Sequence, residues 1–214
     1  MLDYLFGEKM SKSLKVLVAT TLTMTIVSGC ASLTPTIETN ESYSIYDIKP
    51  TQGVTSEQIS NAIKTGLQKN MSGVRVTTQI PPHPLPEQPG RFQMINPLQN
   101  SAIAALAASS GTSLRVPACE NSILTANSSN DSMRNYGEDT RFFLCLLPYQ
   151  AGYHLNIYTS FTKASGGFST RSLGATLARS IVGDSSQNIQ PRIDSIVKEI
   201  TSTGAEVTLV ESHP

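Results

Sequence analysis

The sequence predicts an α+β fold, in which a mainly antiparallel sheet carries helices packed on one face. Two observations lead to this prediction. Segments with the alternation of β-strands follow one another over residues 121–165, with only short polar turns between them. Segments with the three-and-four spacing of amphipathic helices occupy residues 55–71 and the stretch after Pro191. Strands in series that are flanked by helices are typical of this class.

The first half of the domain predicts a strand, a helix and a second strand. Residues 43–49, YSIYDIK, alternate β-forming side chains and stop at Pro50. Thr55 opens a helix, with Gln58 at the capping-box position. Apolar residues then recur on one helix face: Ile59, Ala62, Ile63, Gly66, Leu67 and Met71. Residues 73–80, GVRVTTQI, predict a strand with four side chains on one face: Val74, Val76, Thr78 and Ile80.

A proline-rich loop is predicted at residues 81–90, PPHPLPEQPG. Its five prolines exclude regular structure and favour polyproline II geometry. Two interpretations remain open for this loop, a docking segment for a partner and a stiff surface connection. A short strand at residues 91–95 and an alanine-rich helix over residues 98–108 are predicted to follow.

The second half predicts two helices and two strands after the hairpin of residues 121–147. Residues 151–165 alternate two sets of side chains, with Tyr153, Leu155, Ile157 and Thr159 on one face and His154, Asn156, Tyr158 and Ser160 on the other. A helix capped by Ser169 or Thr170 is predicted to bury Leu173, Leu177, Ile181 and Val182. A last helix buries Ile193, Ile196, Val197 and Ile200, ends at Gly204 and precedes a short final strand. A long C-terminal helix across a sheet is similar to the helix-grip arrangement of some outer-membrane assembly lipoproteins.

The N-terminus has the organisation of a secretory signal. Lys12 and Lys15 precede the uncharged run of residues 16–27, which ends in small residues. The alternative is a membrane-spanning helix, but twelve residues at 1.5 Å each span about 18 Å, short of a hydrocarbon core of roughly 30 Å. Met10 gives a more basic start than Met1, so translation is expected to begin there.

The signal ends in a sequence that identifies a particular kind of export. Val27-Ser28-Gly29-Cys30 resembles the lipobox of bacterial lipoproteins. The resemblance implies cleavage before Cys30, lipidation of its sulfur and acylation of its new amine, which together anchor the chain in a membrane. Because Asp does not follow Cys30, the resemblance favours the outer membrane, facing the periplasm or the cell surface. We therefore expect a signal peptide at residues 1–29, an anchor and flexible tether at 30–42, and a single domain at 43–214.

Composition limits the partners of the mature chain. Removing residues 1–29 takes away three lysines and two acids, which leaves 13 basic and 14 acidic residues. There is no basic stripe, so nucleic acid is not an expected partner. The expected partners are the membrane, through the lipid on Cys30, and another envelope protein.

Cys119 and Cys145 remain after Cys30, and an even remainder in an oxidising compartment predicts a disulfide. If residues 121–147 form a hairpin centred on residue 132, the two cysteines lie opposite each other and the bond links two strands. A buried pair of free thiols and a metal site are the alternatives, the latter with too few ligands nearby.

No catalytic motif is recognised, and no cofactor is predicted. His154 is expected to face solvent from a strand, and the neighbouring Glu138 and Asp139 to form a solvated strand entry. Gly166 and Gly167 with Arg171 offer an anion site at a helix start, against a plain loop. A possible binding surface gathers aromatic side chains and one histidine around a single strand: Tyr149, Tyr153, His154, Tyr158 and Phe161.

The sequence therefore predicts a non-enzymatic, lipid-anchored envelope protein that binds or scaffolds another envelope component. One alternative is a periplasmic carrier of an apolar ligand, which requires a cavity between the last helix and the sheet. The other is a cell-wall hydrolase, which requires His154, Glu138 and Asp139 to converge in one cleft.

Overall fold

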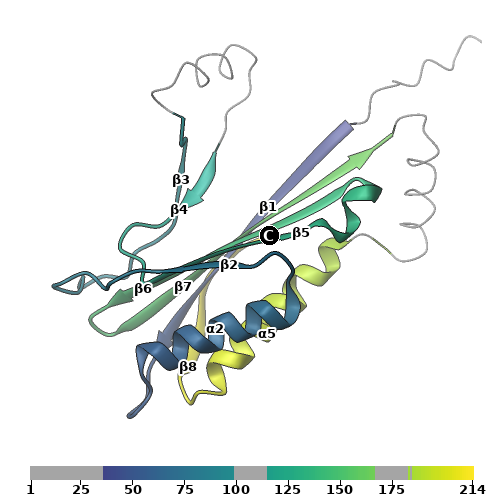
Figure 1. Ribbon diagram of the computed structural model, residues 1–214. Helices are drawn as coiled ribbons and strands as arrows, with labels where there is room; N and C mark the ends of the chain where they lie inside the picture. Colours follow the sequence, from purple (N-terminus) through teal and green to yellow (C-terminus); the bar gives the residue numbers. More distant parts are fainter. Residues whose placement is uncertain (1–35, 99–114, 167–182, 184) are drawn as a thin grey trace, which may run out of the picture.

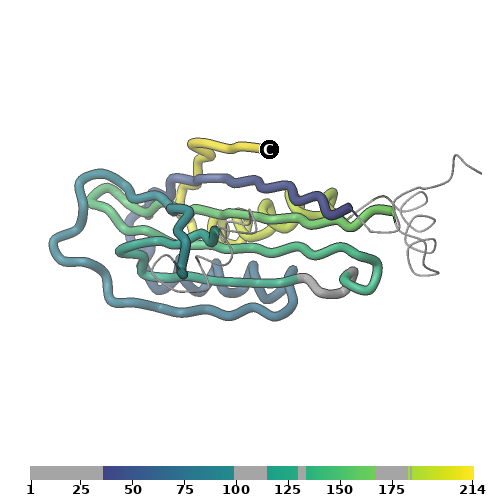
Figure 2. The backbone as a smooth tube through the Cα atoms, turned by 90° about the horizontal axis from the view of Figure 1, so that it is seen from above, coloured from purple at the N-terminus to yellow at the C-terminus, as the bar shows by residue number. Residues whose placement is uncertain are grey.

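Six strands form one antiparallel sheet in the order β2-β5-β6-β7-β1-β8 (Figures 1 and 2). The computed structural model describes residues 36–98, 115–166, 183 and 185–214. The sheet strands are β1 (Thr36–Lys49), β2 (Arg75–Thr78), β5 (Leu124–Asn130), β6 (Glu138–Tyr149), β7 (Gly152–Ser165) and β8 (Glu206–His213). The predicted α+β class with an antiparallel sheet is confirmed.

Two helices, α2 (Ser56–Asn70) and α5 (Ile189–Thr201), pack against each other on one face of this sheet (Figure 1). The predicted capping box of α2 is present, because the Gln58 amide donates to Thr55 Oγ1 at 3.2 Å and the Thr55 amide donates to Gln58 Oε1 at 2.8 Å. The two helices approach closely at Gly66, where an added Cβ would lie 2.9 Å from the Ile196 Cα. A 3₁₀ turn, η2 (Ser185–Asn188), leads into α5.

The core lies between these helices and the sheet. Most of the predicted helix-face residues belong to it, including Ile59, Ile63, Ile196 and Ile200, all with exposed fractions of 0%. Leu155 and Ile157 of β7 meet them from the sheet. Each such buried side chain stabilises the fold by about 1.5–3 kcal/mol.

The proline-rich loop and a small arm lie on the side of the sheet away from the helices (Figures 1 and 2). The arm is a two-stranded antiparallel sheet of β3 (Gln93–Ile95) and β4 (Val116–Ala118), which stands away from the main sheet in Figure 1. Residues 81–90 have no helix or strand, as predicted, and pass around the end of the sheet where β6 turns into β7 (Figure 2). Gly90 lies on Leu147, and the Phe92 amide donates to Asn156 Oδ1 at 3.2 Å.

Two predicted boundaries are wrong. The tether was expected to continue to residue 42, but residues 36–42 already pair with β7 as the start of β1. Their polar sequence hides this strand, because both faces of it are exposed and no apolar alternation is needed. The strand predicted at residues 73–80 is shorter, since β2 ends at Thr78, and Ile80 is 92% exposed instead of sharing a strand face.

The hairpin of β5 and β6 has a different register from the predicted one. A 3₁₀ turn, η1 (Asp131–Tyr136), fills the connection and centres the hairpin on residue 135, so Thr125 lies opposite Cys145. Cys119 follows β4 and nevertheless bonds to Cys145. The predicted disulfide is present, but it ties the arm to a central strand of the sheet and does not link two hairpin strands.

Two of the predicted helices fall on residues that the structure does not describe. The helix predicted at residues 98–108 lies outside the described residues except for its first residue, and the helix predicted at residues 169–182 lies wholly outside them.

Candidate functional site

An open cleft of about 510 Å³ lies at the end of the sheet where β6 turns into β7. This volume is within the range of roughly 300–1,000 Å³ that is usual for ligand sites. The end of β1, the start of α2, the proline-rich loop and the β6–β7 turn all contribute to it. Four prolines, two tyrosines and a leucine supply most of its apolar lining: Pro50, Pro81, Pro82, Pro148, Tyr149, Tyr153 and Leu85. We call this the proline–tyrosine cleft.

A network of polar side chains fixes one wall of the cleft. Tyr149 donates its hydroxyl proton to Asp47 Oδ1 at 2.7 Å and accepts a hydrogen bond from Lys49 Nζ. Lys49 Nζ also lies 3.2 Å from Asp47 Oδ2 and over the Tyr149 ring. The hydrogen bond to Tyr149, and then the Asp47 carboxylate, raise the pKa of Lys49. Both oxygens of Asp47 are therefore engaged, and the network holds the Tyr149 ring in place.

His154 lies behind this wall and does not face solvent as predicted. Its side chain is only 12% exposed, and its ring meets the edge of Tyr149 with centroids 5.6 Å apart. Burial lowers the pKa of His154; the nearby Asp47 opposes this, while Lys49 and Arg91 reinforce it. Nε2 lies 3.9 Å from Asp47 Oδ1, and Nδ1 is buried without a hydrogen-bond partner among the residues that the structure describes. His154 thus contributes packing, because no hydrogen bond from the described part of the chain orients its ring as a base.

We expect His154 to make the protein less stable in mild acid. The folded pKa is below the unfolded value of about 6.5, so the unfolded chain takes up the proton first as the pH falls. This stability contribution is complete above about pH 6.5 and is lost as the pH falls from there to the folded pKa. Urea unfolding between pH 5 and 8 should show that the difference between wild type and His154→Gln shrinks in acid. A difference between wild type and His154→Gln that is independent of pH would contradict this assignment.

The five residues of the predicted binding surface do not share one face. Tyr149, His154 and Tyr158 lie on the face covered by the proline-rich loop. Tyr153 and Phe161 occupy alternate positions of β7 and face the helices, where Phe161 is 2% exposed. Only Tyr149 and Tyr153 line the cleft, because it lies at the sheet end and is open to both faces. The single predicted surface is therefore wrong, although two of its members belong to the site.

The residues proposed for a hydrolase do not converge. Glu138 is 1% exposed and accepts hydrogen bonds from the backbone amide and hydroxyl of Ser185 at 3.1 and 2.7 Å. It pairs across the sheet with Lys163, nine positions along β7 from His154, which is about 30 Å of strand. Asp139 accepts a hydrogen bond from Arg141 at the same end. The anion site predicted with Gly167 and Arg171, and the lipidation site Cys30, lie outside the described residues.

Sequence reasoning missed Asp47, Lys49 and Pro50 as parts of the site. A signal for them was present, because two charged residues at alternate positions of a strand must share a face. The prolines of the loop were recognised, but only the fold brings them against Pro148 and Tyr149. Among the described residues, no helix has both the length and the apolar character needed to cross a bilayer.

The fold and the cleft together define a small α+β domain with a groove lined by prolines and tyrosines at one end of its sheet. No known family matches the sequence, and a search of curated proteins found no relative.

Proposed function

We propose that this chain is a lipid-anchored protein of the bacterial envelope that binds another envelope protein through the proline–tyrosine cleft. The observation that carries the proposal is the cleft itself, which is open and lined largely by proline and tyrosine side chains that lose little freedom on binding. Grooves lined by aromatic side chains and prolines suit extended, proline-containing or apolar segments of a partner. The lipobox at Cys30 resembles that of bacterial lipoproteins. This resemblance supports both the anchoring and the outer membrane as the location.

The wall of the cleft is preorganised, which favours binding of a partner. The network of Asp47 and Lys49 orients Tyr149. On the loop side, the Gln150 amide donates to the Pro86 carbonyl at 2.9 Å. Arg91 forms two contacts with the Glu211 carboxylate, at 2.8 and 2.9 Å, which fix the far end of the loop on β8. These contacts favour the interpretation of the loop as a docking segment for a partner over that of a stiff surface connection.

The geometry of β1 gives the cleft an orientation under this proposal. Six peptide steps separate Cys30 from Thr36, so a lipidated Cys30 would keep the start of β1 within about 20 Å of the membrane. The fourteen residues of β1 then extend about 45 Å to the cleft, which lies beside its other end. The cleft would thus be presented away from the anchoring membrane, within reach of a partner in the periplasm or at the surface.

The two alternatives have weaker support. A carrier needs a cavity between α5 and the sheet. Ile196 and Ile200, both 0% exposed, fill the middle of that space, and the hollow of about 410 Å³ at the start of α5 is open to solvent and includes Asn40, Glu41 and Gln190 in its lining. A hydrolase needs catalytic residues in one cleft, and the residues considered lie at opposite ends of the sheet. We therefore propose a non-enzymatic role.

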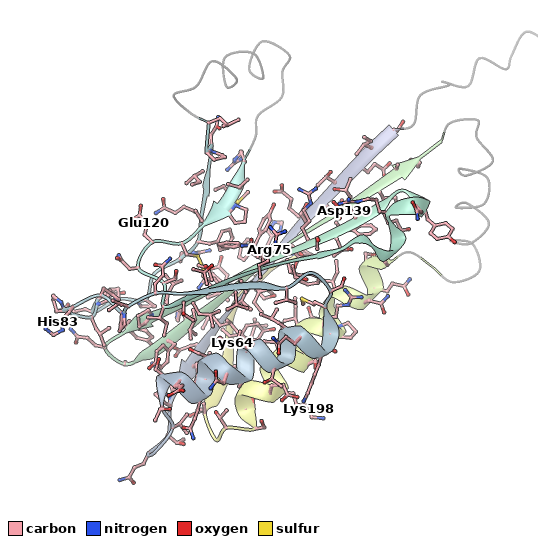
Figure 3. All side chains as sticks on the ribbon, in the orientation of Figure 1. Lys64, Arg75, His83, Glu120, Asp139 and Lys198 are labelled. Atoms are coloured by element: carbon pink, nitrogen blue, oxygen red, sulfur yellow. A yellow bond between two sulfur atoms is a disulfide. The ribbon has the colours of Figure 1, made fainter. Side chains whose placement is uncertain are left out.

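Site-specific photocrosslinking in the envelope tests this proposal. A photoreactive residue at His83, at the outer end of the loop in Figure 3, should give a discrete adduct with one envelope protein. The same residue at Lys198 on α5, on the other side of the molecule, should give none (Figure 3). Adding Leu85→Glu, a change on the loop surface, should reduce the His83 adduct at least severalfold. Cys30→Ala should move the chain from the membrane fraction to the soluble fraction.

Each of the two parts of the proposal, binding through the cleft and anchoring through Cys30, has an outcome that would contradict it. Equal adducts from His83 and Lys198, or an adduct unaffected by Leu85→Glu, would exclude the proline–tyrosine cleft as the contact. A chain that is soluble with Cys30 intact would exclude the anchor, independently of the crosslinking result.

A further inference from the structure

A second hollow of about 540 Å³ lies over β2, β5 and β6, and the proposed partner-binding function does not use it. Its lining includes Arg75, Asn127, Ser129 and Arg141, beside Gly73 and Val74. We call it the arginine cleft. Arg141 is seven positions along β6 from Pro148, so about 23 Å of strand separates this cleft from the proline–tyrosine cleft.

The register of the sheet brings the four polar residues together. Arg75 lies directly opposite Asn127, and Arg141 lies directly opposite Ser129. Side chains at such paired positions have Cβ atoms about 4.5–5.5 Å apart. All four are on the face turned away from the helices, since Ala126 and Phe142, at alternating positions of the same strands, belong to the core. Two guanidinium groups therefore flank an amide and a hydroxyl on the strand between them.

Most donors of the two arginines are unused within the part of the chain that the structure describes. Arg75 is exposed and forms no hydrogen bond or ion pair there. Arg141 donates from Nε to Asp139 Oδ2 at 2.9 Å, and its two terminal amino groups have no partner in that part of the chain. Asp139 thus engages only Nε of the Arg141 guanidinium and leaves its two terminal amino groups available to a ligand. Figure 3 places Arg75 and Asp139 on the sheet side, away from Lys64 and Lys198 on the helices.

The rim of the arginine cleft is tied to β5 by two reciprocal hydrogen bonds. Ser72 Oγ donates to the Ser129 carbonyl at 3.2 Å, and Ser128 Oγ donates to the Ser72 carbonyl at 3.0 Å. These bonds position the turn at Gly73 beside Ser129. The paired strands and the turn at Gly73 are therefore already ordered in the absence of a ligand. This reduces the conformational entropy that is lost on binding.

We propose that the arginine cleft binds a phosphate group. Guanidinium groups present planar pairs of N–H donors that match phosphate oxygens, and two of them with one carboxylate leave a local charge of about +1. Asn127 and Ser129 supply further neutral donors between them. The phosphate has two possible sources, a lipid headgroup and a free phosphate compound. The site itself does not depend on the proposed anchoring, but a headgroup source would be near if Cys30 holds the chain on a membrane.

Arginine side-chain NMR of the full chain, whether or not Cys30 carries lipid, tests the site. Inorganic phosphate, titrated at constant ionic strength, should shift the Nε–Hε signals of Arg75 and Arg141 with saturation. Arg75→Gln and Arg141→Gln should each weaken this binding at least about tenfold, because each removes a charge-assisted pair of hydrogen bonds. Lys198→Gln removes the same charge from the helix side and should leave the affinity unchanged.

A second titration, with glycerophosphoglycerol as the headgroup of an anionic phospholipid, separates the two sources. Tighter binding than that of inorganic phosphate assigns the site to membrane lipid, and weaker binding assigns it to free phosphate compounds; both outcomes support the site. Absence of a saturable shift with either probe overturns the proposal. Affinity that stays the same in both arginine variants, with both variants folded as judged by their unfolding midpoints, also overturns it.

Discussion

Replacing both Cys119 and Cys145 with alanine is expected to lower the free energy of unfolding by about 3.5 kcal/mol. The bond closes a loop with a sequence separation of 26 residues, and the chain-entropy relation gives this value for a loop of that length. Urea unfolding at fixed temperature measures it, and Cys30 is left in place so that only this bond changes. A midpoint equal to that of the wild type would contradict the expectation.

The effect should also have a local component, because the disulfide connects elements that are separate in the sheet topology. Cys145 is fully buried on β6, whereas Cys119 follows β4 in the arm. Hydrogen exchange at the amides of β3 and β4 should therefore rise more in the variant than exchange at β6 and β7. Reductant should destabilise the wild type by a similar amount and leave the double variant unchanged, which separates loss of the bond from the effect of the alanines.

The disulfide illustrates what the sequence could and could not predict. Counting cysteines predicts the pair, because two remain besides Cys30 and an even number tends to pair in the oxidising compartment that an exported chain is expected to reach. The geometry was wrong because η1 takes up six residues of the connection and shifts the register of β5 against β6. A turn of this kind has no strong local signal, whereas a one-residue change of register alters every partner along the hairpin.

The helices could be predicted from local sequence, whereas the candidate site could not. The apolar positions of α2 and α5 were predicted from their spacing, since a helix that covers a sheet must bury one stripe. The site depends on distant segments that meet at one cleft, such as Pro82 of the loop and Pro148 of β6. Aromatic residues of β7 were grouped because they are close in sequence, but alternation directs Tyr153 and Phe161 to one face and Tyr158 to the other. Sequence spacing fixes faces within an element and leaves open which elements meet.

Gly152→Ala is expected to destabilise the protein by about 3 kcal/mol or more, within the range reserved for severe single substitutions. Gly152 begins β7 after the turn from β6, with φ of 154°, and an added Cβ would lie 2.3 Å from the carbonyl oxygen of Ile48. That oxygen belongs to the backbone of β1, so no side-chain rotation relieves the contact. Either β1 must separate from β7 or the turn must change shape.

Gly53→Ala is the matched control for this substitution. Gly53 also has a positive φ, 92°, but an added Cβ there meets nothing within 4 Å. It should cost about 1–2 kcal/mol, the usual penalty of a left-handed conformation for a residue with a Cβ. Chemical denaturation of the two variants therefore separates backbone conformation from the steric contact with β1. Equal losses in the two variants would contradict the close approach of β1 to the β6–β7 turn. Since Gly152 and Tyr149 are paired at that turn, the same substitution should also reduce the photocrosslink at His83 if this part of the sheet supports the proline–tyrosine cleft.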